Sequence, residues 1–177
     1  MVQFVTFAER PDLAKRYSEE SGPYWPPHME FMNHDPVCNT YWSRLGPEFG
    51  DFQFVAYDDS EDRFLAHCNT VPLAWTGDDD DLPAGVPAVL DRSFAEAANG
   101  APPTAVCALL ALIQPGARSS GLSAQLLTFM KEIARRHRLP WLVAPVRPNL
   151  KETYPITPME RYVQWRRGDG LMFDPWM

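Results

Sequence analysis

The sequence predicts an α/β domain, and three observations lead to that prediction. An almost unbroken apolar run over 105–113 has the length and composition of a strand buried on both faces. Two strand-like runs, 52–57 and 63–73, flank the polar segment 58–62 and predict an antiparallel hairpin. After a glycine-bearing loop, apolar residues recur about one helical turn apart, at Leu122, Leu126, Phe129, Met130 and Ile133.

Weaker patterns predict the remaining elements. The alternation over 2–7 is typical of a first strand, and 141–146 is apolar enough for a last one. Helices are expected at 9–21, at 36–45, at 89–98 and from Thr157 to Gly168, where Thr157 is the N-cap and Pro158 the first helical residue.

Length and composition limit the class of protein. A chain of 177 residues with 45% hydrophobic residues has the size and core of one domain. It has no apolar run long enough to span a bilayer, and residues 1–4 lack the features of a signal peptide, so we expect a cytoplasmic protein with no membrane partner. The net charge of −7 argues against nucleic-acid binding.

Three cysteines, Cys38, Cys68 and Cys107, are widely spaced. This spacing predicts buried free thiols and no disulfide framework or zinc site. His28, His34 and Asp35 are the other candidates for metal ligands, but their spacing matches no established site, so we expect no metal.

The loop 116–121 precedes a predicted helix, and a helix begins with backbone N–H groups that lack an intrahelical partner. Such a terminus can bind phosphate. Gly121 would let the backbone approach an anion, Ser123 can donate its hydroxyl, and Arg118 adds a positive charge. A plain strand-to-helix turn that binds nothing explains the glycine spacing equally well.

These residues resemble the acetyl-CoA signature of the GNAT N-acetyltransferases, in which a strand ending in Val-x-Pro is followed by Arg or Gln, two residues, Gly, one residue, and Gly or Ala. In the segment 113–123, Arg118, Gly121 and Ser123 stand at the key positions, with Ser where the family has Gly or Ala. The segment 146–149 is also similar to the Val-Arg-Pro-x-Asn that ends the family's fifth strand. The resemblance is specific over about 104–149.

The resemblance implies a GNAT-like (acyl-CoA N-acyltransferase) fold over a single domain, 1–177, with a mixed, mostly antiparallel central sheet flanked by helices. The central strands of that sheet splay to admit acetyl-CoA. The sequence stops before the family's last two strands, which predicts a truncated C-terminal end or a sheet edge completed by something else. The family and the open edge together lead us to expect a homodimer.

The implied activity is transfer of an acetyl or related acyl group from acetyl-CoA, the co-substrate, to a primary amine. Backbone groups of Leu112 and Ile113 would position the pantetheine arm. The pyrophosphate and its surroundings would be held by the remaining cofactor residues, which are Ala117, Arg118, Ser119, Ser120, Gly121, Leu122, Ser123 and Asn149.

The resemblance also points to catalytic and acceptor-binding candidates. Tyr162 matches the family's catalytic tyrosine best and Tyr154 second, as the acid that protonates the departing thiolate. The aromatic segment 22–52 would overlie the acceptor site and offers Trp25, His28 and Phe31 as substrate contacts. Candidates for the base in that segment are Glu30, His28, His34 and Asp35, and a chain of water molecules could replace them all.

Two other functions stay open. A non-catalytic acyl-CoA-binding module would keep the fold without the acid and base, and Ser123 and the irregular segment after Asn149 leave room for it. The basic helix end 131–138 would suit a nucleic-acid-binding protein, against the acidic total charge. The acidic run 78–81 hints at a cationic small molecule, although a solvated loop explains it as well.

Overall fold

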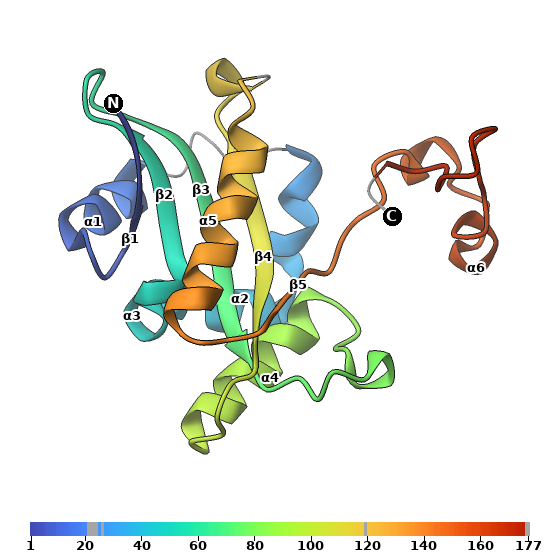
Figure 1. Ribbon diagram of the computed structural model, residues 1–177, viewed down its shortest axis with the longest axis horizontal. Helices are drawn as coiled ribbons and strands as arrows, with labels where there is room; N and C mark the ends of the chain where they lie inside the picture. Colours follow the sequence, from blue (N-terminus) through green and yellow to red (C-terminus); the bar gives the residue numbers. More distant parts are fainter. Residues whose placement is uncertain (21–24, 26, 119, 176–177) are drawn as a thin grey trace. The chain divides into compact units, whose positions relative to one another are not determined.

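A five-stranded mixed sheet organises the first 144 residues, in the order β1-β2-β3-β4-β5 (Figure 1). Neighbouring strands from β1 to β4 are antiparallel, whereas β5 is parallel to β4. The strands are β1 Val2–Thr6, β2 Gln53–Asp58, β3 Arg63–Leu73, β4 Ala105–Ile113 and β5 Trp141–Val143. The predicted sheet and its first four strands are therefore confirmed.

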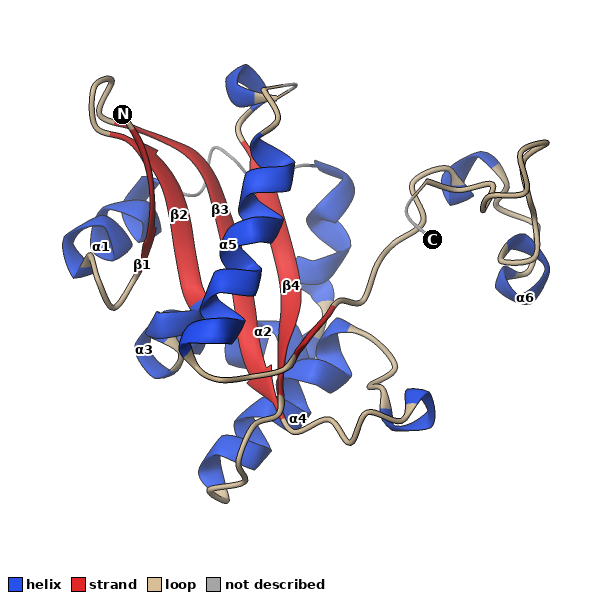
Figure 2. Ribbon diagram, in the orientation of Figure 1, coloured by secondary structure: helices blue, strands red, loops and turns tan. Residues whose placement is uncertain are grey.

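Helices pack on both faces of the sheet (Figure 2). On one face, Phe129 of helix α5 contacts Phe4 of β1 and Phe54 of β2, with ring centroids 5.7 and 4.8 Å apart. On the other face, Leu13 of helix α1 packs in one cluster with Val55 of β2. The helices are α1 Pro11–Glu20, α2 Pro36–Tyr41, α3 Leu45–Glu48, α4 Val86–Ala98, α5 Leu122–Arg136 and α6 Met159–Tyr162.

The beginning of β4 is buried between these layers, as its apolar sequence predicts. Ala105, Val106 and Cys107 are at most 1% exposed. Only these three residues pair with β5, through Trp141, Leu142 and Val143. In the part of the chain that the structure describes, the same edge of β4 has no strand partner from residue 108 to residue 113.

The strand expected at 141–146 is shorter than predicted. β5 ends at Val143, two residues before Pro145. Proline has no backbone N–H to donate to a sheet, and it restricts the residue before it. Pairing therefore stops early, and β4 and β5 separate after three residue pairs (Figure 2).

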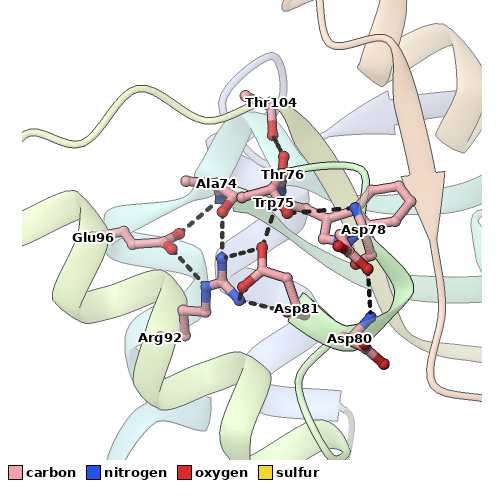
Figure 3. Close-up of polar contacts among 9 residues, drawn as sticks. All are labelled: Ala74, Trp75, Thr76, Asp78, Asp80, Asp81, Arg92, Glu96 and Thr104. Atoms are coloured by element: carbon pink, nitrogen blue, oxygen red, sulfur yellow. Dashed lines mark hydrogen bonds and ion pairs between the residues drawn. The ribbon is translucent and has the colours of Figure 1, made fainter.

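Arg92 of α4 ties the acidic loop to the end of β3 (Figure 3). Its guanidinium donates to the Asp81 carboxylate at 2.9 Å, to the Glu96 carboxylate at 2.7 Å and to the Ala74 carbonyl. Glu96 in turn accepts from the Ala74 N–H at 2.7 Å. Arg92 and the Thr76 N–H hold the pKa of Asp81 well below its usual range. This part of the acidic run thus has a structural role.

The structure is a computed structural model that describes residues 1–20, 25, 27–118 and 120–175, without the side chains of 27, 28 and 31. The chain divides into two compact units, Met1–Ala144 and Pro145–Met177. The single domain expected from the length stays a prediction.

The helix predicted from Thr157 to Gly168 is wrong in its extent. α6 covers only Met159–Tyr162, its N-cap is Pro158, and no side chain caps it. After Tyr162 the backbone tightens, because the Trp165 N–H donates to the Tyr162 carbonyl three residues back at 3.1 Å. The chain then turns so that the Phe173 N–H reaches the Trp165 carbonyl at 3.0 Å. The turn replaces the rest of the helix.

Candidate active site

The loop between β4 and α5 presents the start of a long helix. Gly121 is the N-cap residue of α5 and has φ +76°, a left-handed conformation that favours glycine. Its cap has no side-chain hydrogen bond, and the first turn of α5 contains no acidic residue. Arg118 is exposed beside it. The backbone N–H groups at this terminus and the Arg118 side chain therefore make an exposed position with positive charge.

The 3-10 helix Pro115–Ala117 follows β4 and contacts β3. The Ala117 N–H donates to the Gln114 carbonyl at 2.9 Å, and the Ser120 hydroxyl donates to the Ala117 carbonyl at 2.8 Å. Ala117 itself is buried. Among the predicted cofactor residues, Ser119 lies outside the described part of the chain.

A cavity of about 1350 Å³ opens on the face of the sheet that carries α1 and α2. Its walls come from α1, from the segment 25–51, and from strands β3 and β4. Trp25, Glu30 and Leu112 line it, which brings three of the sequence-predicted site residues together. The side chains of His28 and Phe31 lie outside the described residues.

The charge of the cavity is negative. Glu30, Glu48 and Asp51 are among its lining residues, and the described lining contains no lysine or arginine. Arg44 neutralises Glu48 through a 2.6 Å ion pair, while Glu30 is 4.0 Å from the His34 ring. The remaining carboxylates favour a ligand with net positive charge.

Two polar residues of β3, His67 and Asn69, face the cavity and were not singled out from the sequence. Both are 7% exposed. His67 Nδ1 lies 2.5 Å from the Tyr17 hydroxyl of α1. The register places His67 opposite Leu112 of β4, so this pair lies beside the edge expected to hold the pantetheine arm.

Burial lowers the pKa of His67 to about 4, while the neighbouring Asn69 side chain opposes that shift. The ring is therefore neutral at pH 7. The signal in the sequence was a histidine and an asparagine two positions apart in an apolar strand, which alternation places on one face. Their proximity to Tyr17 depends on the packing of α1, which no local pattern contains.

The C-terminal unit contains the other predicted catalytic residues. The Tyr162 hydroxyl is buried and donates to Asp174 Oδ2 at 2.8 Å, and Asp174 also accepts from the N–H groups of Asn149 and Leu150. Burial, followed by the bond to Asp174, raises the pKa of Tyr162 to about 12. Tyr154 packs against Trp165, with ring centroids 4.9 Å apart. Asn149 and Tyr162 thus share a buried carboxylate.

Two classes of feature are absent from the residues described. None of their helices is long and apolar enough to cross a membrane. No group of three or more histidine, cysteine, aspartate or glutamate side chains gathers there in a way that could hold a metal ion.

Solved structures similar to this chain share the GNAT fold. The loading GNATL domain of CurA from Lyngbya majuscula superposes with a TM-score of 0.58 at 16% identity, over 99% of this chain and 78% of that one. AAC(6')-Iy, in complex with the bisubstrate analog CoA-S-monomethyl-acetylneamine, gives a TM-score of 0.51 at 11% identity, over 94% and 98% of the two chains. At these identities the likeness concerns the fold.

The chain has the GNAT fold. A curated relative is similar in sequence: arginine N-acetyltransferase avaD of Aspergillus versicolor is 29% identical over 190 residues. The match covers 97% of this chain and 64% of the length of the relative. No protein-family model matches the sequence.

Proposed function

We propose that this GNAT-fold protein is an N-acetyltransferase that moves an acetyl group from acetyl-CoA to a primary amine of a small cationic acceptor. One observation carries the proposal: the free edge of β4 leads through the loop after Ile113 to the start of α5, while Leu112 of the same strand lines an acidic cavity. A donor site and an acceptor site would thus meet along one strand. The name of the relative, an arginine N-acetyltransferase, supports a cationic acceptor.

The donor would lie along β4 and across the loop. In this arrangement the pantetheine amides pair with the backbone of Leu112 and Ile113, and the pyrophosphate lies on the N–H groups of 117–123. Arg118 would add its charge, and the Ser123 hydroxyl would donate where the family has Gly or Ala. Asn149 remains a proposed member of this set.

The chemistry needs a neutral amine close to the thioester. The amine nitrogen attacks the thioester carbon, the C–N bond forms, the C–S bond breaks and CoA leaves as a thiolate. The amine proton goes to a base, for which Glu30 or a water in the cavity is proposed. The thiolate takes a proton from an acid, for which Tyr162, or else Tyr154, is proposed. Backbone N–H groups of β4 would stabilise the oxyanion.

A non-catalytic acyl-CoA-binding module is the second candidate, and one observation favours it. The Tyr162 hydroxyl already donates to the buried Asp174, which commits the proton that an acid would transfer. Release of CoA on incubation with a panel of amines separates the two candidates. If acetyl-CoA binds tightly but no amine in the panel causes release of CoA, the non-catalytic module is favoured.

The test of the donor site is thermal melting with and without acetyl-CoA. At saturating ligand we expect the wild-type melting temperature to rise by roughly 5–10 °C. Ser123→Asp places a carboxylate in the first turn of α5, which favours the helix but repels the pyrophosphate. The variant should therefore melt no lower than wild type when empty and should lose the shift.

Ser123→Asn is the matched control, because it has nearly the same shape as the aspartate without the charge. It should keep most of the shift. An equal shift in wild type and Ser123→Asp would place acetyl-CoA elsewhere. The homodimer also stays a proposal, and sedimentation equilibrium would decide it.

A further inference from the structure

Two buried polar atoms on the wall of the cavity have no hydrogen-bond partner among the described residues: Asn69 Oδ1 and Trp25 Nε1. One is an acceptor and the other a donor. A buried polar group without a partner is costly and rare, and a ligand is one way to satisfy it. The cavity wall therefore has one hydrogen-bond acceptor and one hydrogen-bond donor that no described residue satisfies.

The orientation of the Asn69 amide follows from its neighbours. The buried Gln53 donates through Nε2 to the carbonyls of Phe49 and Thr70, at 3.0 and 2.6 Å. Its Oε1 must therefore accept, and it does so from Asn69 Nδ2 at 2.9 Å. Asn69 Oδ1 is consequently the acceptor end of the amide, and it lies near His67 without a hydrogen bond of good geometry to any described residue.

Position and charge indicate what each atom would bind. Asn69 is opposite Leu110 of β4, next to the pair of His67 and Leu112, so its Oδ1 is suited to an amine N–H near the proposed thioester. Trp25 Nε1 is suited to an oxygen of the ligand, because it can only donate. The negative lining, with Glu30 and Asp51, also favours a ligand that is cationic as a whole.

We propose that the acceptor is an amino acid with a cationic side chain, which donates an amine N–H to Asn69 Oδ1 and accepts from Trp25 Nε1–H through its carboxylate. This inference rests on the proposed function for the identity of the reaction. It adds the carboxylate as a required part of the acceptor, so simple amines and polyamines are excluded as good substrates. Both residues are specificity determinants.

Binding can be measured without turnover by NMR of protein labelled with ¹⁵N-tryptophan. The indole resonance of Trp25 is the one that is lost in Trp25→Phe, which keeps a ring and removes the N–H. L-arginine, L-lysine and L-ornithine are titrated beside agmatine, cadaverine and putrescine, the same molecules without their carboxylates. We expect at least one amino acid to shift the Trp25 resonance and to bind more tightly than its decarboxylated partner.

The variants separate the two contacts. Trp25→Phe should weaken the amino acid roughly tenfold or more, as expected for a lost hydrogen bond to a charged group, and leave its partner amine unchanged. Asn69→Leu should weaken both ligands, and a thermal melt shows whether it folds without its bond to Gln53. Ser93→Ala is the matched control: Ser93 Oγ is also buried without a partner among the described residues but is outside the cavity.

The proposal is overturned if no amino acid of the set binds, or if Trp25→Phe weakens both members of a pair equally or neither. Should Asn69→Leu fail to fold, the Trp25→Phe comparison alone decides. Binding with the expected variant pattern but no release of CoA would contradict the proposed transferase and leave this inference standing. If the protein acetylates a simple amine but none of the amino acids, the proposed transferase stands and this inference is overturned.

Discussion

His67 combines deep burial with a titratable ring, and the pH dependence of stability should report it. Its folded-state pKa is about 4, below the ordinary value of 6.5. Between these values the unfolded chain binds a proton that the folded chain does not, so stability falls as the pH falls through this window. The loss should be on the order of 3 kcal/mol for this residue.

Chemical denaturation of wild type and His67→Gln from pH 7 to pH 4 measures this effect. The variant should lose less stability over that window than wild type. His34→Gln alters an exposed histidine and should follow the wild-type curve. Parallel curves for wild type and His67→Gln would mean that the ring is solvated and that the cavity wall differs from the one described.

At the scale of elements, Arg92 links α4, the acidic loop and the end of β3. Replacing it by methionine keeps the packing of the stem but leaves Asp81, Glu96 and the Ala74 carbonyl without their donor. We expect a loss of about 1–3 kcal/mol and faster amide exchange over 74–82. Hydrogen–deuterium exchange measures the local effect.

Arg135→Met is the matched control, since Arg135 on α5 forms an ion pair with Glu132 but its side chain is 78% exposed. An exposed pair contributes little, so exchange should stay as in wild type. If Arg92→Met exchanged no faster over 74–82, the loop would be held by its own capping bonds, such as the one from the Asp80 N–H to Asp78 at 3.0 Å.

Elements with a strong local pattern were predictable, and those that depend on distant contacts were not. The apolar run over 105–113 predicted β4 with both of its bounds, and the helical stripe from Leu122 to Ile133 predicted α5. β5 ends early because of Pro145, which is itself a local signal in the sequence. For α6, the capping pattern at Thr157 predicted a helix as far as Gly168, but the turn that brings Phe173 to Trp165 replaces most of it.

The candidate site divides in the same way. Arg118, Gly121 and Ser123 follow each other along the chain, so a motif was enough to find them. His67, Asn69 and Tyr17 meet only after α1 packs on β3, across 50 residues from Tyr17 to His67. A polar residue inside an apolar strand was the only trace in the sequence, and it does not name its partner.

At the scale of the whole molecule, the division into two compact units predicts that the two units unfold separately. Asp174 accepts from two backbone N–H groups and from Tyr162 within the unit 145–177. Asp174→Ala leaves these three donors without that acceptor, and the buried Tyr162 hydroxyl alone should cost roughly 1–3 kcal/mol. We expect proteolysis to begin after residue 144 while 1–144 stays protected.

Asp174→Asn keeps one acceptor oxygen and should be cut more slowly than Asp174→Ala. Digestion of both units at one rate would instead indicate that they unfold together, as the single domain expected from the length would. The same Asp174→Asn variant and Tyr162→Phe can be compared for CoA release. If Tyr162 acts as the acid, Tyr162→Phe loses turnover although it still binds acetyl-CoA. A purely structural role of the tyrosine does not require that loss.

The burial of the three cysteines has a practical consequence. Cys38, Cys68 and Cys107 are at most 3% exposed. Burial raises the pKa of all three, to about 11 for Cys38, where Asp35 adds to it, and to about 12 for Cys107. Thiolate is the form that reacts with disulfide reagents. The folded protein should therefore give a low background with such a reagent, so CoA liberated during turnover can be followed continuously by its colour.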